Sequence, residues 1–165
     1  MTESDRTVYQ PDIRDERPED RAAVWQVEAD AFGRTAEADL VGRLADDTAF
    51  SLVAELDGRI VGHVLFTWLP VGDRRALALA PLAVQPGVQG RGVGGALVRA
   101  GLARAEALGV PGVVVLGDPG YYGRFGFTAD HRITQAYGWP AEAFQAITYT
   151  DLAGPAVYPA AFLEE

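Results

Sequence analysis

The stretch Leu-Ala-Leu-Ala-Pro-Leu-Ala-Val-Gln-Pro-Gly-Val-Gln-Gly-Arg-Gly-Val-Gly-Gly spans residues 77–95 and says more about the fold than any other part of the sequence. Its first half is apolar nearly throughout, which predicts a strand over residues 75–84 that is buried on both faces. Pro81 lies inside this strand, where it cannot donate a hydrogen bond to a neighbouring strand. A proline at such a place indicates a bulge, or a point where neighbouring strands part. Parted strands would leave backbone N–H and C=O groups available to an extended ligand that carries amides.

The second half of the stretch is rich in glycine and leads into a helix expected over residues 92–108. Four of the six residues 90–95 are glycine, so the backbone can come close to a ligand. The first turn of a helix offers unpaired N–H groups and a positive dipole end, and Arg91 adds a mobile cation. The loop therefore predicts a pyrophosphate site next to the parted strands. Together the two features match coenzyme A, with its phosphates at the helix and its pantetheine along the strand.

Two other interpretations of the glycine loop are open. Gly90, Gly92 and Gly95 satisfy the dinucleotide-binding pattern G-x-G-x-x-G, and Asp118 lies near the place of a ribose-binding acid. That pattern needs its first glycine directly after the strand, whereas residues 85–89 intervene here. The chain also lacks the repeated β-α-β units of a doubly wound sheet. The third interpretation is a turn whose glycines only let a helix pack closely. Pro81 favours coenzyme A over both.

The rest of the chain predicts further elements around this unit, in one α/β domain over residues 1–165. We expect strands at residues 9–15, 50–55, 59–69, 113–116 and 144–150, helices at residues 18–31 and 35–44, and an irregular tail at residues 152–165. Asp57-Gly58 supplies the positive φ angles of a tight hairpin turn. The strand at 113–116 completes a β-α-β unit with parallel strands. The inward stripe of the helix at 92–108 is expected to consist of Val93, Ala96, Leu97, Ala100, Ala103 and Ala107.

Composition excludes several classes of function. The chain of 165 residues has no cysteine, and all 14 of its basic residues are arginine. These absences exclude disulfides, a cysteine acyl-enzyme, a Walker-A phosphate loop and a Schiff-base lysine. With only His63 and His131 as histidines, no metal site is expected.

Charge and hydropathy bound the partners. The net charge of −9 argues against nucleic-acid binding and favours a cationic acceptor, although acidity also serves solubility alone. No apolar run approaches the roughly 20 residues that span a bilayer, and no signal peptide is visible. We therefore expect a cytoplasmic protein that binds no membrane and is a monomer or homodimer.

Residues 82–94 resemble motif A of the GNAT superfamily of N-acetyltransferases. That motif is a strand, then Val-x-Pro, then Gln/Arg-x-x-Gly-x-Gly/Ala at the start of a helix, and the match here is complete. The family also has a later strand, a short helix that bears a tyrosine, and a Gly-Phe pair. Tyr122, Gly126 and Phe127 match these positions. The strong resemblance covers residues 77–127, a weaker one covers most of the chain, and the similarity is to small bacterial acetyltransferases.

The resemblance implies the acyl-CoA N-acyltransferase fold, a splayed mixed sheet flanked by helices, with acetyl-CoA as cosubstrate between the fourth and fifth strands. Tyr122 falls where the family places its general acid. The backbone of Leu82 and Val84 would bind pantetheine, and the loop would hold the pyrophosphate. The implied coenzyme-binding residues are Leu82, Ala83, Val84, Gln89, Gly90, Arg91, Gly92, Val93, Gly94, Gly95, Tyr122 and Arg124.

The general base is open at this point, because residues 79–84 hold no counterpart to the glutamate that some relatives carry on the fourth strand. Glu28 shares a helix face with Val24 and Ala31, so it points either inward, with a raised pKa, or into solvent. Asp118 is either a base or the cap of the turn that follows it. His63 and a water molecule are the other candidates.

The expected function is transfer of an acetyl group from acetyl-CoA to a primary amine by direct attack in a ternary complex. The acceptor would be a small molecule, a peptide N-terminus or a protein lysine. The alternative is a coenzyme-A-binding sensor or partner domain that has the fold without turnover.

Overall fold

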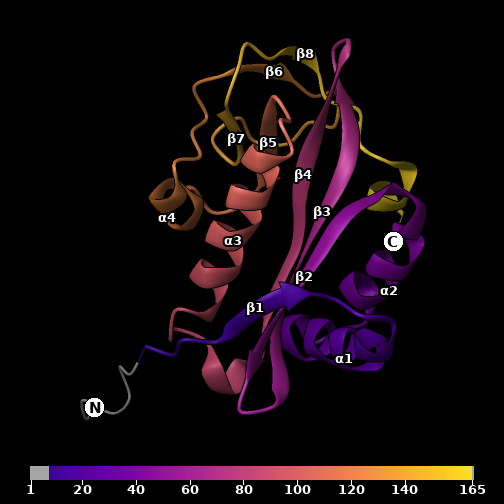
Figure 1. The fold of residues 1–165 in the computed structure, drawn as a ribbon. Coiled ribbons are helices and arrows are strands. Elements are labelled where there is room, and N and C mark those ends of the chain that lie inside the picture. Colours follow the sequence, from indigo (N-terminus) through magenta and orange to yellow (C-terminus); the bar gives the residue numbers. More distant parts are fainter. Residues whose placement is uncertain (1–7, 165) are drawn as a thin grey trace.

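A mixed sheet of six strands runs through the computed structural model, which describes residues 8–164, in the order β1-β2-β3-β4-β5-β7 (Figure 1). The strands are β1 (Asp12–Asp15), β2 (Thr48–Leu56), β3 (Arg59–Val71), β4 (Arg74–Val84), β5 (Gly112–Leu116) and β7 (Phe144–Thr148). Neighbours in the sheet are antiparallel except β4 and β5, which are parallel. The predicted splayed mixed sheet flanked by helices is therefore confirmed, although the first strand is shorter than expected.

Helices cover both faces of this sheet. They are α1 (Arg21–Phe32), α2 (Ala36–Arg43), α3 (Val93–Ala107) and the short α4 (Pro119–Tyr122). A Cβ atom built on Gly62 of β3 would lie 2.9 Å from Leu97 of α3, whereas the next residue, His63, bonds Glu28 of α1. Because successive residues of a strand point to opposite faces, α3 and α1 lie on opposite sides of the sheet (Figure 1).

Turns and helix ends follow the local sequence signals. Asp57 and Gly58 have φ angles of 53° and 77°, which confirms the predicted tight turn between β2 and β3. Gly33 ends α1 with φ 67°. Thr35 occupies the N-cap position of α2, but its side chain makes no capping hydrogen bond. The helix predicted at residues 35–44 is therefore present without a side-chain cap at its first residue.

The bulge and the parting predicted at Pro81 are both present. The register between β3 and β4 shifts between Val64 and Phe66, which lie opposite this part of β4. On the other side, β4 pairs with β5 only through Leu77 and Ala78. The strands separate beyond that point, so the proline marks the start of a gap in the sheet.

The buried face of α3 differs from the predicted stripe. The buried residues of the helix are Val93, Leu97, Val98, Gly101 and Ala105. Ala103 and Ala107 are exposed. An alanine-rich helix is apolar on several faces, so periodicity alone did not select the right one. Gly101 decides the orientation, because only a residue without a side chain fits against Phe66 there.

The tail is more regular than expected. Strands β6 (Arg132–Thr134) and β8 (Ala153–Pro155) pair in parallel as a second, two-stranded sheet, and residues 160–163 form a 3₁₀ turn. Aromatic side chains pack beneath them with β7, including Tyr137, Trp139 and Tyr158. Within residues 8–164, no helix is both long enough and apolar enough to cross a bilayer.

Candidate functional site

The gap between β4 and β5 opens directly after two paired residues. The parallel ladder joins Leu77 to Val113 and Ala78 to Val114, and it ends there. Residues 79–84 of β4 have no strand partner on that side within the described sheet. Their backbone groups on that side are therefore available to a ligand in extended conformation.

The ladder with β3 shows which groups face the gap. Gln85 donates its backbone N–H to the carbonyl of Val61 at 2.8 Å. In an antiparallel pair, hydrogen-bonded and non-bonded positions alternate, so Ala83 also faces β3. Leu82 and Val84 then project their N–H and C=O groups into the gap. Among the three strand residues predicted to bind the coenzyme, only these two present their backbone to it.

The glycine loop lies at the end of this gap and starts α3. Gly90 and Gly92 have φ angles of 75° and 89°, which favour glycine, and Gly92 is the N-cap. The first bond inside the helix runs from the N–H of Ala96 to the carbonyl of Gly92 at 3.0 Å. The N–H groups of residues 93–95 thus have no partner inside the helix. They form an anion site of the kind that binds phosphate.

Contacts of Gln89 and Arg91 hold the loop in place. The amide of Gln89 donates to the carbonyl of Val84 at 2.9 Å, which ties the loop to the strand it follows. The backbone carbonyl of Arg91 accepts a hydrogen bond from the backbone N–H of Tyr9 at 2.8 Å. The guanidinium of Arg91 lies 5.7 Å from the ring of Tyr9. Gln89 and Arg91 therefore shape the loop through contacts that do not involve the N–H groups of residues 93–95.

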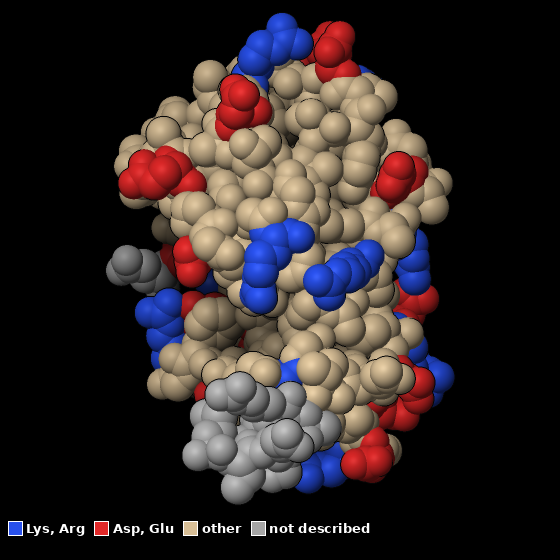
Figure 2. Space-filling model, turned by 90° about the vertical axis from the view of Figure 1, so that its left-hand side faces the viewer, with Lys and Arg blue, Asp and Glu red and all other residues tan. Residues whose placement is uncertain are grey.

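Further arginines lie beside the loop. The guanidinium of Arg99 is 5.0 Å from the ring of Phe125, and a Cβ atom on Gly95 would be 2.9 Å from its Nη1. Arg124 stacks 4.5 Å above the ring of Tyr121. Figure 2 shows basic side chains near the middle of the face on which α3 and α4 lie, with acidic side chains toward its outline. Positive charge is thus concentrated where phosphates would bind, on a chain of net charge −9.

Tyr122 ends α4 beside the parted strands. Its ring lies so close to Gly117 that a Cβ atom there would be 2.6 Å from it, and it meets Phe127 edge-on at 5.7 Å. Burial raises the pKa of the Tyr122 phenol to about 12. Asp118 caps α4, accepting a hydrogen bond from the N–H of Gly120 at 2.9 Å. Of its two expected roles, capping is the one that the structure displays.

A buried acid and a buried histidine form a pair on the opposite face of the sheet. Oε2 of Glu28 lies 2.6 Å from Nδ1 of His63, and both side chains are 0 % exposed. Burial raises the pKa of Glu28, and the bond to His63 opposes this shift. The second carboxylate oxygen, Oε1, has no hydrogen-bond partner among the described residues. His63 is paired with Ala83 across the ladder, so this acid lies near the gap.

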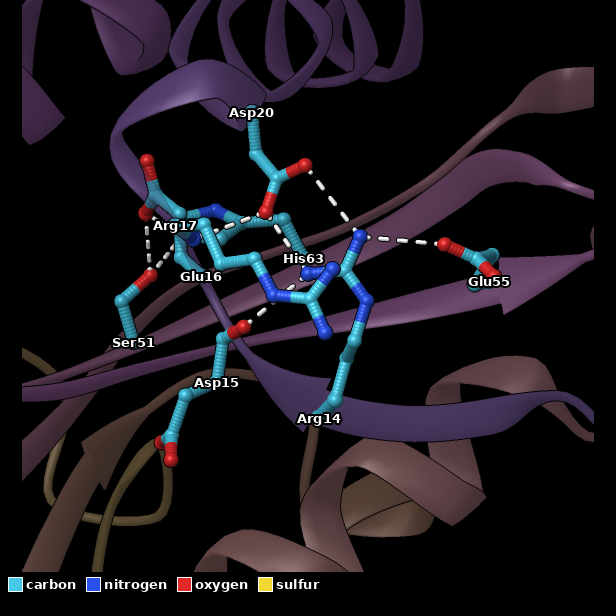
Figure 3. Close-up of polar contacts among 8 residues, drawn as sticks. All are labelled: Arg14, Asp15, Glu16, Arg17, Asp20, Ser51, Glu55 and His63. Atoms are coloured by element: carbon cyan, nitrogen blue, oxygen red, sulfur yellow. Dashed lines mark hydrogen bonds and ion pairs between the residues drawn. The ribbon is translucent and has the colours of Figure 1, made fainter.

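The hydrogen bonds continue from His63 toward the edge of the sheet. Nε2 of His63 lies 2.8 Å from Oγ of Ser51 on β2, and Ser51 donates to Oε1 of Glu16 at 2.6 Å (Figure 3). Glu16 follows β1, and its side chain is 15 % exposed. It lines a cavity of about 790 Å³ together with Arg17 and Arg21.

An ion-pair cluster fixes the start of α1 beside this cavity. Arg14 donates to Asp20 at 2.7 Å and 3.2 Å and to Glu55 at 3.0 Å (Figure 3). The bond from Arg14 is the main reason why the pKa of Asp20 is lowered, and the backbone N–H of Arg17 also lowers it. Among residues 8–164, no three histidine, aspartate or glutamate side chains converge as a metal site requires.

Residues 10–127 match the family model described as the acetyltransferase (GNAT) family, which is more than half of the chain. The chain belongs to this family. The GNAT relatives include the N-acetyltransferase YjhQ of Escherichia coli K12, 43% identical over 116 residues, which are 66% of this chain and 64% of YjhQ. The N-acetyltransferase YhbS of the same strain is 36% identical over 146 residues, which cover 84% of this chain and 87% of YhbS.

Solved GNAT structures share the fold closely. YhbS from Escherichia coli, in complex with CoA, superimposes with a TM-score of 0.85 at 32% identity, covering 94% of this chain and 93% of YhbS. A GNAT acetyltransferase from Brucella melitensis, in complex with acetyl-CoA, gives 0.79 at 38% identity over 93% of this chain and 98% of its own. Homologues of this acetyltransferase thus bind the predicted cosubstrate.

The acetyltransferase brings most of its predicted site residues together around the gap, namely Leu82, Val84, Tyr122, Arg124 and residues 89–95. Glu28 lies on the opposite face of the sheet, where its pairing with His63 was not foreseen. Arg99, Ser51 and Glu16 were missed altogether. Only Arg99 carried a usable signal, because it lies one helical turn after Gly95 and so on the same side of α3.

Proposed function

We propose that this acetyltransferase transfers the acetyl group of acetyl-CoA to a primary amine that attacks directly in a ternary complex. The orientation of Leu82 and Val84 into the gap, beside the N–H groups of residues 93–95, is the observation that carries the proposal. The backbone of Leu82 and Val84 can bind the amides of pantetheine, and the N–H groups of residues 93–95 can bind the pyrophosphate. The complexes of two relatives with acetyl-CoA and CoA support the same assignment.

The chemistry requires a polarised thioester and a protonated leaving group. The N–H of Leu82 is proposed to stabilise the oxyanion that forms during attack. Tyr122 is proposed to protonate the departing thiolate. Its pKa of about 12 keeps the phenol protonated at neutral pH, so it can donate whenever the thiolate forms. Because the chain has no cysteine, a cysteine acyl-enzyme is excluded and direct attack is preferred.

The amine must lose a proton before it attacks. Glu28 is proposed to receive this proton, because its Oε1 is a buried acceptor without a hydrogen-bond partner and its pKa is raised by burial. The side chain is fully enclosed, so a water molecule is proposed to carry the proton to it. Asp118 is not proposed for this role, since it caps α4.

The proposal includes the cationic acceptor and the cytoplasmic location expected from the sequence. The alternative is a coenzyme-A-binding sensor without turnover, because residues 79–84 of β4 carry no acid. Glu28 and His63 supply a buried acid–base pair from other elements, which favours an enzyme.

Release of free thiol from acetyl-CoA in the presence of a panel of primary amines tests the proposal. Tyr122→Phe should lower kcat by about 100-fold while the Kd for CoA stays unchanged, because a general acid acts on the transition state. Tyr149→Phe is the matched control, since the Tyr149 hydroxyl contacts the carbonyl of Leu102 away from the gap. Calorimetry that detects no binding of CoA at millimolar concentration would overturn the assignment, and an unchanged kcat would remove Tyr122 from the mechanism.

A further inference from the structure

Four side chains form one continuous hydrogen-bonded chain across the sheet. It runs from Glu28 on α1 to His63 on β3, Ser51 on β2 and Glu16 after β1, with distances of 2.6, 2.8 and 2.6 Å. Figure 3 shows its outer part, where Glu16 and Ser51 point toward each other near His63. The inner end is fully buried and the outer end lies at the wall of the cavity beside β1.

Proton counting shows that this hydrogen-bonded chain is loaded, which means that it holds one proton more than it would with both carboxylates ionised and the imidazole neutral. Each of its three hydrogen bonds needs one proton between two heavy atoms. With both carboxylates ionised and the imidazole neutral, His63 and Ser51 supply only two. The three bonds can form together only if one more proton is present. The four groups therefore carry one negative charge in this geometry instead of two.

The protons in the loaded chain can all point toward Glu16. In that arrangement Oε2 of Glu28 donates to Nδ1 of His63, Nε2 donates to Ser51, and Ser51 donates to Glu16. One concerted shift moves each proton along its own hydrogen bond. It leaves Glu28 ionised and Glu16 protonated, and no atom moves far.

The two ends of the chain have different surroundings. Around Glu28, the charged or titratable groups are His63 on β3 and, at longer range, Glu37 on α2. The cavity wall around Glu16 carries Asp15, Arg17, Arg21 and Arg104. Arg104 is paired with Asp15 at 2.9 Å. The outer end can therefore exchange protons with solvent, and the inner end cannot.

The inner end lies close to the gap that is proposed to bind acetyl-CoA. His63 is paired with Ala83, the residue between the two whose backbone faces the gap. Gln85, directly after β4, donates to Asp30 of α1 at 3.0 Å, so the helix that carries Glu28 contacts the end of β4. The chain thus links the proposed reaction centre with the opposite edge of the sheet.

We propose that this chain is a proton relay that carries the proton lost by the acceptor amine to the cavity beside β1. The inference rests on the proposed function. The ammonium gives one proton through water to Oε1 of Glu28, the shift protonates Glu16, and Glu16 releases one proton to solvent. The neutral amine then forms the C–N bond as the C–S bond breaks; Tyr122 protonates the thiolate, and the second proton of the amine restores the Tyr122 phenol. One proton enters and one leaves in each turnover, and the Ser51 hydroxyl and the His63 ring must then rotate to restore the first arrangement.

Through such a route, a proton would leave by the cavity beside β1 and would not have to pass the ligand in the gap. During turnover the cosubstrate fills the gap and the acceptor covers the reacting carbonyl. An exit beside β1 stays open throughout. Ser51, His63 and Glu16 act as relay residues, because none of them needs to touch the substrate.

Buffer rescue of a truncated relay tests the inference. Glu16→Ala should lower kcat about tenfold in dilute buffer, with an unchanged KM for acetyl-CoA, and small buffers such as imidazole or formate should restore it from the cavity. Glu19→Ala is the matched control, because Glu19 is an exposed acid in the same segment of sequence but is not part of the hydrogen-bonded relay. This variant should keep kcat without any buffer effect. Ser51→Ala should lower kcat similarly and resist rescue, because the break lies inside the protein. Wild-type kcat in both relay variants, or a loss in Glu16→Ala that no buffer relieves, would overturn the relay.

Nitrogen NMR of labelled histidine gives a readout that does not need activity. Only His63 and His131 contribute signals. In the wild-type protein near neutral pH, Nε2 of His63 should carry a proton, because it donates to Ser51. In Glu16→Gln the amide donates to Ser51, the hydroxyl turns to His63, and Nε2 should lose its proton. An Nε2 without a proton in the wild-type protein would refute the relay, whereas a missing acetyl transfer with the expected NMR result would refute only the proposed function.

Discussion

Replacing Gly101 by alanine tests how closely α3 packs on the sheet. A Cβ atom at this position would lie 2.2 and 2.4 Å from two ring carbons of Phe66. Carbon atoms prefer a separation of about 3.5–4.0 Å, so helix and ring must move apart by more than about 1 Å. Phe66 is fully buried and stacks on Phe50 at 4.6 Å, so its ring has no free direction in which to turn.

The expected cost follows from two opposing effects. Overpacking a core costs about 1–3 kcal/mol, and so short a contact belongs at the upper end. Alanine in place of glycine inside a helix returns about 1 kcal/mol. The free energy of unfolding of Gly101→Ala should therefore fall by about 2 kcal/mol. In Gly42→Ala on α2, where the new Cβ meets nothing within 4 Å, it should rise by about 1 kcal/mol.

Urea unfolding followed by tryptophan fluorescence measures both variants. Gly101→Ala should also lower Tm by roughly 4–8 °C for a chain of this size. Shortening the ring in Gly101→Ala/Phe66→Leu should recover part of the loss. The reasoning is refuted if Gly101→Ala is as stable as Gly42→Ala, because the same substitution would then have the same effect with and without the contact.

Three further predictions concern the site and its pH dependence. Gly92→Ala should weaken CoA binding about tenfold in calorimetry, because φ 89° strains alanine by about 1–2 kcal/mol, whereas Gly87→Ala, with open space around it, should bind normally; equal Kd values would contradict this. Because the pKa of Asp20 is lowered, its ionised carboxylate stabilises the fold above the ordinary pKa near 3.8, and this stabilisation is lost as pH falls through the lowered pKa. Arg14→Met should therefore lose less stability than wild type in urea unfolding between about pH 6 and about pH 2. Since the pKa of Tyr122 is about 12, kcat should show no descending limb from this group up to about pH 10, and a limb that vanishes in Tyr122→Phe would be the contrary result.

The features that local sequence signals predicted are those that depend on backbone constraints. Pro81 predicted the bulge and the gap because a missing N–H has the same consequence in any sheet. The glycines of residues 90–95 predicted the turn that starts α3, since the positive φ angles of Gly90 and Gly92 favour glycine. Asp57-Gly58 predicted its turn for the same reason.

The features that were missed depend on tertiary packing. Glu28 and His63 are 35 residues apart, and nothing in either local pattern shows that α1 lies over that part of β3. The same holds for Ser51 and Glu16, which join the chain only through strand register. The alanines of α3 made several of its faces equally apolar, so the choice of face depended on one contact between Gly101 and Phe66.

The bulge at Pro81 also changes which residues of β4 face each side of the sheet. Before it, Leu77 and Leu79 lie on the α3 side, and after it Leu82 and Val84 do, so odd positions give way to even ones. If the same residues alternated strictly without the bulge, everything downstream of Pro81 would change sides, whereas deleting a single residue here would restore alternation and leave the downstream residues on their present sides. In the strictly alternating strand, the backbone N–H and C=O groups of Leu82 and Val84 would turn toward β3 instead of the gap. One extra residue in β4 thus keeps the backbone of Leu82 and Val84 directed into the gap while Ala83 stays opposite His63.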